Sequence, residues 1–342
     1  MQKYILTTLI AVFVLALGMA KPVMAEGSGE FSIQVPPSPL VATVKPGEST
    51  ELELKIRNTG SLAENLKINP RAFKIDPSNQ QLQISEDQMP EITSWIHFSM
   101  PAFTVQSGQT FSEKVTLAVP KDAGFSYSFA LIIGRSDQAA QHTGNTLKAS
   151  VAIFTLINVD RPGAIRALEI SKFSTTQGSY EYLPAEFHVE LKNTGNTIVQ
   201  PSGNIFILQG ETPVDTLLVN EGGGYILPGA ARTLSVKWEN GLQVVRPKVQ
   251  ADSSTKNELT WQWENLSHMR FGQYTARLVA IYNDGHRDVP LQSEITFWIL
   301  PWGMMAGALV LVGLVGLGIW SLASRIVKVS RKSGRKKMRL GR

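Results

Sequence analysis

The chain offers few side chains that could perform catalysis or hold a metal ion. Its histidines are scattered, without the short spacings that would bring two ring nitrogens onto one metal. His188 alternates with apolar neighbours, which predicts a solvent-facing side chain on a strand. Because the chain contains no cysteine, thiol catalysis and thiolate metal sites are excluded. The five histidines are His97, His142, His188, His268 and His286.

The other patterns that support catalysis are missing from the sequence as well. It has no Gly-x-Ser-x-Gly elbow, no glycine-rich phosphate loop and no His-Glu-x-x-His pair. Glu86 and Asp87 are adjacent carboxylates with no third acid placed opposite them, which is typical of a solvated turn. Asp284-Gly285 separates two strand-like runs and predicts a hairpin turn, since a calcium loop needs more oxygen ligands at alternate positions. The sequence therefore predicts a non-enzymatic protein without metal or cofactor.

Trp261 and Trp263 are the side chains best suited to binding. They are separated by one residue on a predicted strand, so both indoles would lie on the same face. They belong to an insertion from about residue 243 to 268, whose polar middle at 251–257 predicts a loop. Two alternatives are open: the indoles cap the hydrophobic core, or they form an aromatic contact patch for a sugar or a protein partner.

The carboxyl-terminal part of the chain predicts a membrane anchor. An apolar run from Phe297 to Ala323 carries no charge, and nine basic residues follow it without an acidic one. A helix of about 20 apolar residues spans a hydrocarbon core roughly 30 Å thick, and a basic flank favours the cytoplasmic side. We predict a transmembrane helix over 297–324 and a basic cytoplasmic tail over 325–342. Its membrane-interface residues would be Trp298 and Trp302 outside, and Arg325, Lys328, Arg331 and Lys332 inside.

The membrane segment also carries Gly303 and Gly307, a small-xxx-small spacing that lets two helices approach closely. Glycine is common in membrane helices, so the spacing leaves self-association of the chain open.

The amino terminus predicts a secretory signal peptide over 1–25. Lys3 precedes an apolar run at 5–19, and Val23-Met24-Ala25 offers small residues for cleavage. The alternative is an uncleaved signal anchor. Both alternatives place residues 26–296 outside the cytoplasm, in a single-pass plasma-membrane protein with an extracellular amino-terminal part.

The formal net charge of +5 belongs to the whole chain and does not describe the predicted extracellular part. All 28 acidic residues lie between the signal peptide and the tail, whereas 11 of the 33 basic residues lie in those two ends, which leaves a net charge of −6 in between. A mildly acidic exterior argues against nucleic acid, and against an anionic wall polymer held by charge alone. The basic tail sets orientation and contacts anionic lipid.

The extracellular part reads as strands almost throughout. Polar and apolar residues alternate over 49–57, 111–119, 186–191 and 233–238, and Gly, Pro, Asn and Asp clusters separate such runs. About 270 residues without disulfides must form domains with their own buried cores. We predict an all-β protein with two tandem immunoglobulin-like β-sandwiches, at 26–160 and 164–296, followed by the membrane helix.

The two predicted domains repeat a motif. Leu52–Gly60 and Phe187–Gly195 are both alternating strands that end in a basic residue and Asn-Thr-Gly, a turn sequence that tolerates positive φ. Each domain also has a Pro-Gly turn, Pro46-Gly47 in the first and Pro228-Gly229 in the second, and an aromatic-rich strand near its end, at 125–129 and 271–274.

The first domain follows a pattern of a tryptophan strand, a small turn, a long alternating strand and a VP-x-DA-G turn into an apolar strand. The residues are Ser94-Trp95-Ile96, Phe103-Thr104-Val105, Ser107-Gly108, Val115–Pro120, Asp122-Ala123-Gly124 and Phe129–Gly134. With its signal peptide, two domains, single anchor and basic tail, the chain resembles the WxL-interacting proteins of Gram-positive cell surfaces. The resemblance implies a binding role at the cell wall, with peptidoglycan or a WxL-bearing surface protein as the partner. The Trp261 and Trp263 insertion departs from the pattern and puts a host-binding role of the second domain in doubt.

These observations favour a membrane-anchored, non-catalytic surface protein that holds another surface protein or a cell-wall polymer through sheet edges and loops. One alternative is an accessory to export or assembly that stabilises exported chains by exchanging a β-strand with them. A second alternative is a glycan-binding or sugar-active protein that uses the two tryptophans.

Overall fold

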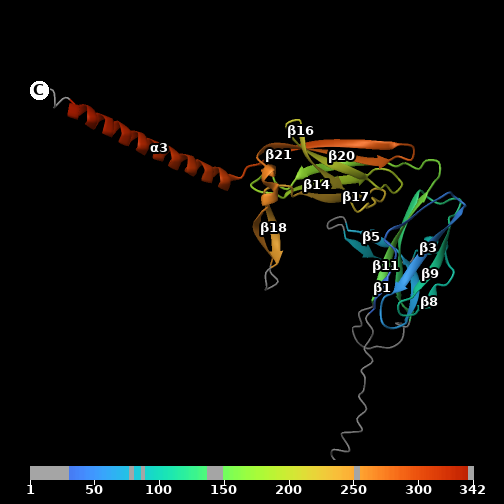
Figure 1. Cartoon of the computed structure of the whole chain (residues 1–342). Helices are drawn as coiled ribbons and strands as arrows, with labels where there is room; N and C mark the ends of the chain where they lie inside the picture. Colours follow the sequence, from blue (N-terminus) through green and yellow to red (C-terminus); the bar gives the residue numbers. More distant parts are fainter. Residues whose placement is uncertain (1–30, 77–80, 86–88, 137–148, 250–254, 338–342) are drawn as a thin grey trace, which may run out of the picture. The chain divides into compact units, whose positions relative to one another are not determined.

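The computed structural model describes residues 31–76, 81–85, 89–136, 149–249 and 255–337. The chain divides after Pro162 into two compact units, and each unit is described by itself (Figure 1). The predicted signal peptide and the end of the tail, at 338–342, lie outside the described residues.

The first unit is a sandwich of two sheets that enclose one hydrophobic core. One sheet has the strand order β1-β3-β9-β7 and the other has the order β2-β11-β10-β4-β8, with β2 parallel to β11 and the other pairs antiparallel. The elements are β1 (Ile33–Gln34), β2 (Leu40–Val44), β3 (Ser49–Asn58), β4 (Glu64–Arg71), the hairpin β5 (Phe73–Ile75) and β6 (Leu82–Ile84), α2 (Pro90–Thr93), β7 (Ile96–Phe98), β8 (Ala102–Val105), β9 (Thr110–Ala118), β10 (Ser126–Arg135) and β11 (Ser150–Val159).

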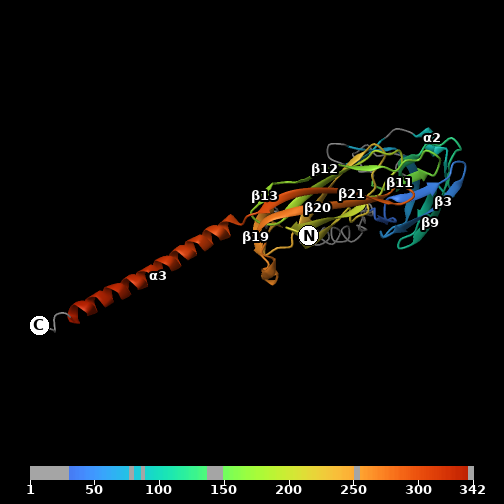
Figure 2. The same ribbon diagram turned by 90° about the horizontal axis from the view of Figure 1, so that it is seen from above.

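The second unit repeats this plan with fewer strands. Its sheets have the orders β12-β14-β17 and β13-β21-β20-β15-β16, and β20 and β21 run side by side over their full length (Figure 2). A separate ribbon of β18 and β19 stands out from the sandwich (Figure 1). The elements are β12 (Leu168–Thr175), β13 (Ser179–Tyr180), β14 (Ala185–Asn193), β15 (Ser202–Gln209), β16 (Thr212–Val219), β17 (Ala231–Trp238), β18 (Gln243–Val249), β19 (Thr255–Trp261), η2 (Trp263–His268), β20 (Gly272–Asn283), β21 (Asp288–Ile299) and α3 (Trp302–Lys337).

Alternation along the strands builds both cores. In β14 every second side chain, from Ala185 to Asn193, is buried, because successive side chains of a strand point to opposite faces. The core of the second unit centres on Phe187, Trp238, Tyr274 and Phe297, and the rings of Phe187 and Phe297 meet edge to face at 5.4 Å. Burial of a phenylalanine side chain contributes about 1.5–3 kcal/mol. The predicted all-β fold of immunoglobulin-like sandwiches followed by a helix is confirmed.

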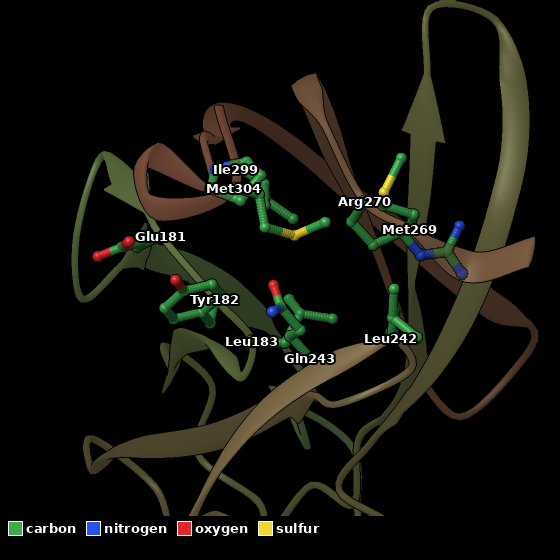
Figure 3. Close-up of a pocket in the computed structure, with 11 residues that line it drawn as sticks. Glu181, Tyr182, Leu183, Leu242, Gln243, Met269, Arg270, Ile299 and Met304 are labelled. Carbon is green, nitrogen blue, oxygen red and sulfur yellow. The ribbon is translucent and has the colours of Figure 1, made fainter. Parts of the chain in front are cut away.

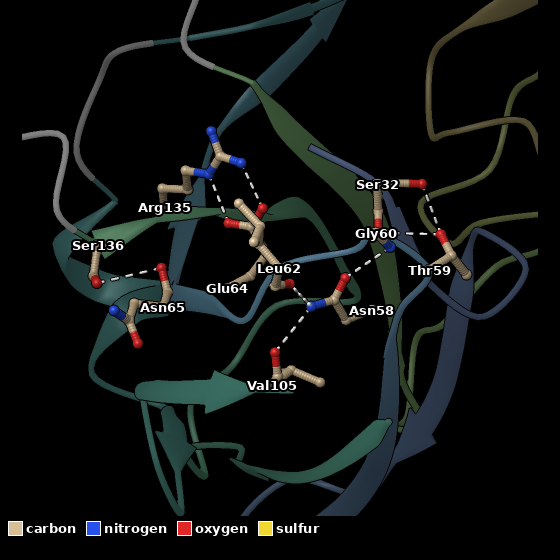
Figure 4. A network of polar contacts seen from close by, with 10 residues as sticks. All are labelled: Ser32, Asn58, Thr59, Gly60, Leu62, Glu64, Asn65, Val105, Arg135 and Ser136. Atoms are coloured by element: carbon tan, nitrogen blue, oxygen red, sulfur yellow. Dashed lines mark hydrogen bonds and ion pairs between the residues drawn. The ribbon is translucent and has the colours of Figure 1, made fainter. Parts of the chain in front are cut away.

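The repeated Asn-Thr-Gly motif forms the same corner in both units, and Figure 4 shows that of the first unit. Asn58 is fully buried, its amide donates to the carbonyl oxygens of Leu62 at 2.7 Å and Val105 at 2.9 Å, and its side-chain oxygen accepts from the Gly60 amide at 2.9 Å. One side chain thus joins the turn after β3 to the end of β8.

Asn193 makes the equivalent bonds in the second unit. Its amide donates to Thr197 O at 2.7 Å and Ile226 O at 2.9 Å, and its oxygen accepts from Gly195 N at 2.9 Å. This correspondence aligns β14 with β3 and β17 with β9.

The two Pro-Gly turns occupy different places in the two units. The Gly229 amide donates to Asn193 O at 3.0 Å, and in the first unit the amide that reaches Asn58 O, at 2.9 Å, is that of Gly108. Both glycines have positive φ, 72° and 74°, whereas Gly47 bonds to Val119 O at the other end of β3. The turns correspond by position in the fold and not by the presence of proline.

The aromatic-rich strands form a tyrosine corner in each unit. Tyr127 lies near the start of β10, and its hydroxyl accepts from the Gly124 amide at 2.6 Å. Tyr274 lies near the start of β20, and its hydroxyl accepts from the Phe271 amide at 3.2 Å. Such a corner is typical of the sixth strand of immunoglobulin-like domains.

The predicted start of the membrane helix at Phe297 is wrong. Phe297 is fully buried in the core on β21, which ends at Ile299, and the helix begins at Trp302. Trp298 therefore belongs to the last strand. The apolar run joins a buried strand to a helix long and apolar enough to cross a membrane, and hydropathy alone does not separate the two.

Candidate functional site

The described residues show no cluster of three or more His, Asp or Glu side chains that could hold a metal ion. His188 lies on the outer face of its sheet, where its ring nitrogens bond to Thr176 at 3.0 Å and Ser235 at 3.1 Å. Asp284 forms the predicted hairpin turn, and bonds from the amides of Arg287 and His286 hold the pKa of its carboxyl below the usual value. Glu86, Asp87 and His142 lie outside the described residues.

Trp261 and Trp263 are brought together, but not as two positions of one strand. Trp261 ends β19 and Trp263 begins η2. Their rings stack with centroids 5.2 Å apart and planes inclined by 12°. The side chains are 41% and 68% exposed, so the core-capping alternative is excluded. Their role in contacting a partner stays a prediction.

The loop predicted at 251–257 is shorter than expected. Thr255, Lys256 and Asn257 begin β19 and pair with the end of β18, while 250–254 lie outside the described residues.

The helix α3 leaves the second unit with two residues between it and β21. Residues 302–324 form a stretch long and apolar enough to cross a membrane, and the protein buries none of it. Side-chain placement is not described from Arg325 to Lys337, so the predicted inner interface of Arg325, Lys328, Arg331 and Lys332 stays a prediction.

The first helical turn is bonded to the sandwich beside a small pocket (Figure 3). The Gly303 amide donates to the Glu181 carboxylate at 3.2 Å, and the Leu300 amide donates to Tyr180 O at 2.8 Å. A carboxylate at a helix amino terminus is favourable because the terminal amides point at it. Burial and, secondarily, Glu181 raise the pKa of the Tyr182 phenol above its ordinary value.

Gly303 contacts its own domain. A Cβ at this position would lie 3.0 Å from the Tyr182 hydroxyl, whereas one at Gly307 would meet nothing within 4 Å. Gly303 therefore allows the start of the helix to pack closely against Tyr182 of its own domain. Association of two helices through Gly303 and Gly307 stays a prediction.

One candidate binding surface, which the sequence did not indicate, is the edge of β17. In the first unit the corresponding strand β9 is paired on both sides, with β3 and with the short strand β7. In the second unit β17 pairs with β14 alone among the described residues, because β15 and β16, the counterparts of β4 and β8, are joined by a tight hairpin with no strand between them that could correspond to β7. The only sequence signal is the missing counterpart of Ile96–Phe98.

The inward side chains of β17 show the consequence. Register aligns Val236 with Val115 and Leu234 with Glu113; these first-unit residues are at most 1% exposed, whereas Val236 and Leu234 are half-buried. They line a groove of about 550 Å³ together with Leu217 of β16. Its lining also includes polar side chains, among them Arg232, Lys237 and Glu221.

One end of the groove is closed by hydrogen bonds from β17 to β16. The Trp238 indole nitrogen donates to an Asp215 carboxylate oxygen at 2.8 Å, and the Asn240 amide donates to the same oxygen at 3.0 Å. These bonds fix the spacing between the two edges.

No family model and no curated protein matches this chain. Solved structures resemble it at low sequence identity. The class 5 fimbriae chaperone CfaA is 10% identical with a TM-score of 0.37, over 77% of this chain and 99% of CfaA. The CupB2 chaperone of Pseudomonas aeruginosa is 11% identical with a TM-score of 0.33, over 76% and 98% of the two chains. The Escherichia coli chaperone DraB is 13% identical with a TM-score of 0.33, over 67% and 96%. At these scores the likeness says nothing about the function of this chain.

Proposed function

We propose that the protein is a membrane-anchored, non-catalytic binding protein that holds an extended segment of another exported protein. The segment adds to the open edge of β17 as an antiparallel strand and places apolar side chains in the groove. The half-burial of Leu234 and Val236, where the first unit buries the same positions, carries this proposal.

The first unit supplies the pattern for the bound strand. There β7 lies antiparallel to β9, with Ile96 opposite Leu117, and Ile96 is 6% exposed. The Ala118 amide donates to Trp95 O at 2.8 Å, which shows which backbone groups face the added strand. By register the corresponding groups in the second unit belong to Ser235, Lys237 and Glu239. Strand addition of this kind gains affinity from main-chain hydrogen bonds and specificity from alternate side-chain pockets.

The test compares two substitutions of one residue in the full chain. Lys237→Pro removes an amide from the open edge and places a ring where a strand would dock, and edge strands tolerate proline. Lys237→Ala removes the same charge but keeps the amide. A photoreactive amino acid at Val236 identifies the bound segment in cells, and the corresponding synthetic peptide is then titrated against both purified variants.

We expect the Lys237→Ala variant to bind the peptide within about threefold of the original chain, and the Lys237→Pro variant to lose at least tenfold. Hydrogen exchange of the amides at 235–239 should slow on binding. Equal affinity of the two variants, with both shown folded by circular dichroism, would refute strand addition at β17.

The same variant separates a holding role from a role in assembly. In cells that carry Lys237→Pro, a held partner is released from the membrane at an unchanged amount. A client that needs the edge during export falls in amount instead, which would favour the assembly alternative.

A further inference from the structure

Exposed apolar side chains gather at one end of the second unit, the end from which α3 leaves. Trp261, Trp263, Met269, Phe271 and Trp298 are 41%, 68%, 56%, 47% and 45% exposed. Three separate segments contribute them: the ribbon and η2, the approach to β20, and the end of β21. Exposed apolar side chains that lie close together on a protein surface often mark a site of contact with a protein or a membrane.

Strand register places these residues at the same end. Trp298 pairs with Gln273, two residues after Phe271. Trp261 pairs with Gln243, and Gln243 and Met269 line the same pocket as Pro301 and Met304 of the helix junction (Figure 3).

The length of the helix fixes how far this end can lie from a membrane. The apolar stretch has 23 residues. At 1.5 Å per residue it measures about 34 Å, against a hydrocarbon core of about 30 Å and a headgroup layer of roughly 5–7 Å on each side. Only Leu300 and Pro301 separate β21 from the helix, the Leu300 amide is bonded to Tyr180 O and the first helical turn is bonded to Glu181, so there is no long flexible spacer to lift the domain away.

The chemistry of the surface fits the headgroup layer. Tryptophan is enriched at membrane interfaces because its ring is apolar and its indole N–H stays hydrated. On the ribbon, Lys248 is neutralised by Glu258 at 2.7 Å and Arg246 lies 4.0 Å from Glu239. The aromatic side chains, and not an excess of positive charge, would therefore make the contact.

We propose that this end of the second unit is immersed in the lipid headgroup layer, with the stacked Trp261 and Trp263 as a second membrane contact beside the helix. The contact ties the domain to the bilayer at two points and limits its tilting. It needs no anionic lipid. It rests on observations other than those that carry strand binding at β17, although Glu239 at the end of that edge pairs with Arg246 of the ribbon.

The absence of cysteine makes the test direct, since one introduced cysteine is labelled alone. Full-length protein carrying Glu264→Cys, next to Trp263, is labelled with a fluorophore and placed in phosphatidylcholine nanodiscs that contain headgroup-level nitroxide lipids. The matched control is Leu218→Cys, which is also an exposed apolar site, at 60%. Leu218 pairs with Asn204, and Asn204 pairs with Val279 of β20. Val279 is seven residues from Gly272, the start of β20, so Leu218 lies about 24 Å along the strand direction from the end that α3 leaves.

We expect quenching at 264 to exceed quenching at 218 by at least threefold, and to be the same when a third of the lipid is phosphatidylglycerol. The double substitution Trp261→Ala and Trp263→Ala should reduce the quenching at 264 to less than half. Quenching at 264 no greater than at 218 would overturn the proposal. Quenching that survives the double substitution would overturn it too, because the helix alone would then set the position.

A label at 264 that is unquenched by lipid, but changes its emission on addition of peptidoglycan fragments, would also overturn the proposal and assign the tryptophans to a glycan. The label at 218 reports in each variant whether the sandwich is intact, since its emission should not differ between them.

Discussion

Replacement of Asn193 by alanine should strongly destabilise the second unit. The side chain is fully buried and makes three hydrogen bonds, two donated to backbone carbonyls and one accepted from Gly195 N. A buried hydrogen bond contributes about 0.5–1.5 kcal/mol net, and an orphaned buried group costs about 1–3 kcal/mol. Ile226 O keeps a second partner, the Val199 amide at 3.1 Å, so one carbonyl is spared. We expect a loss of about 2–4 kcal/mol in the free energy of unfolding.

Asn283→Ala is the matched control. Asn283 also accepts from the amide of the glycine two residues on, at 2.9 Å, but it is exposed and its amide donates to a side chain, Asp288, instead of two buried carbonyls. Its loss should stay below about 1 kcal/mol, because water replaces the missing partners. Asn58→Ala should cost the first unit as much as Asn193→Ala costs the second, since the two corners share their geometry.

Native-state hydrogen exchange of the full chain in nanodiscs, followed by mass spectrometry of peptides from each unit, measures these free energies. A loss below 1 kcal/mol for Asn193→Ala, or an equal loss for Asn283→Ala, would refute the reasoning that burial of the corner amide holds the two sheets together. Asn193→Asp gives a further check, because a carboxylate facing two carbonyl oxygens should destabilise more at pH 7 than at pH 4, where it takes up a proton.

Two further outcomes follow from single positions. Tyr274→Phe removes the hydrogen bond from the Phe271 amide and should lower the free energy of unfolding by about 1 kcal/mol. Burial raises the pKa of Tyr274, so this tyrosine ionises at lower pH in the unfolded chain than in the folded one; its contribution to stability is complete below about pH 10 and falls as the pH rises towards the folded pKa. Alkaline denaturation should therefore show a smaller loss of stability in the variant than in the original chain. Gly195→Ala would place a Cβ 2.3 Å from a backbone oxygen and should cost about 1–3 kcal/mol, whereas Gly178→Ala meets nothing within 4 Å and should leave the urea midpoint within error.

The fold was predictable because its signals are local. Period-2 alternation follows directly from the geometry of strands, and the Asn-Thr-Gly repeat marks a corner whose three hydrogen bonds are made by the asparagine side chain, while at Gly195 a Cβ would meet Ile165 O at 2.3 Å. The two tyrosine corners also stand at matched positions of the aromatic-rich strands. In contrast, Pro-Gly suits any tight turn, so its presence at Pro46-Gly47 and Pro228-Gly229 did not show which connection each turn serves.

The boundary of the anchor and the binding surfaces were less accessible. A phenylalanine in a hydrophobic core and one in a membrane-spanning helix are equally apolar. Only the pairing of β21 with β20 shows that Phe297 belongs to the core. The edge of β17 is open because the second unit has no strand that corresponds to β7. A missing strand has no residue pattern that the sequence could reveal. The exposure of Trp261 and Trp263 depends on the turn between β19 and η2, where alternation stops applying.

The order of synthesis gives the position of Phe297 a further consequence. This ring packs against Tyr180, Phe187, Trp238 and Tyr274, yet it stands five residues before the start of α3. Domains complete in turn as the chain is made, at about 5–20 residues per second. All strands of the first unit have been synthesised once Val159 leaves the ribosome. The second unit lacks Phe297, the aromatic ring at the centre of its core, until just before the apolar helix α3 is synthesised. If α3 spans a membrane as proposed, folding of the second unit and insertion of the helix fall within seconds of each other, and a stop codon placed just before Phe297 should leave a chain that is both unanchored and unfolded in its second half.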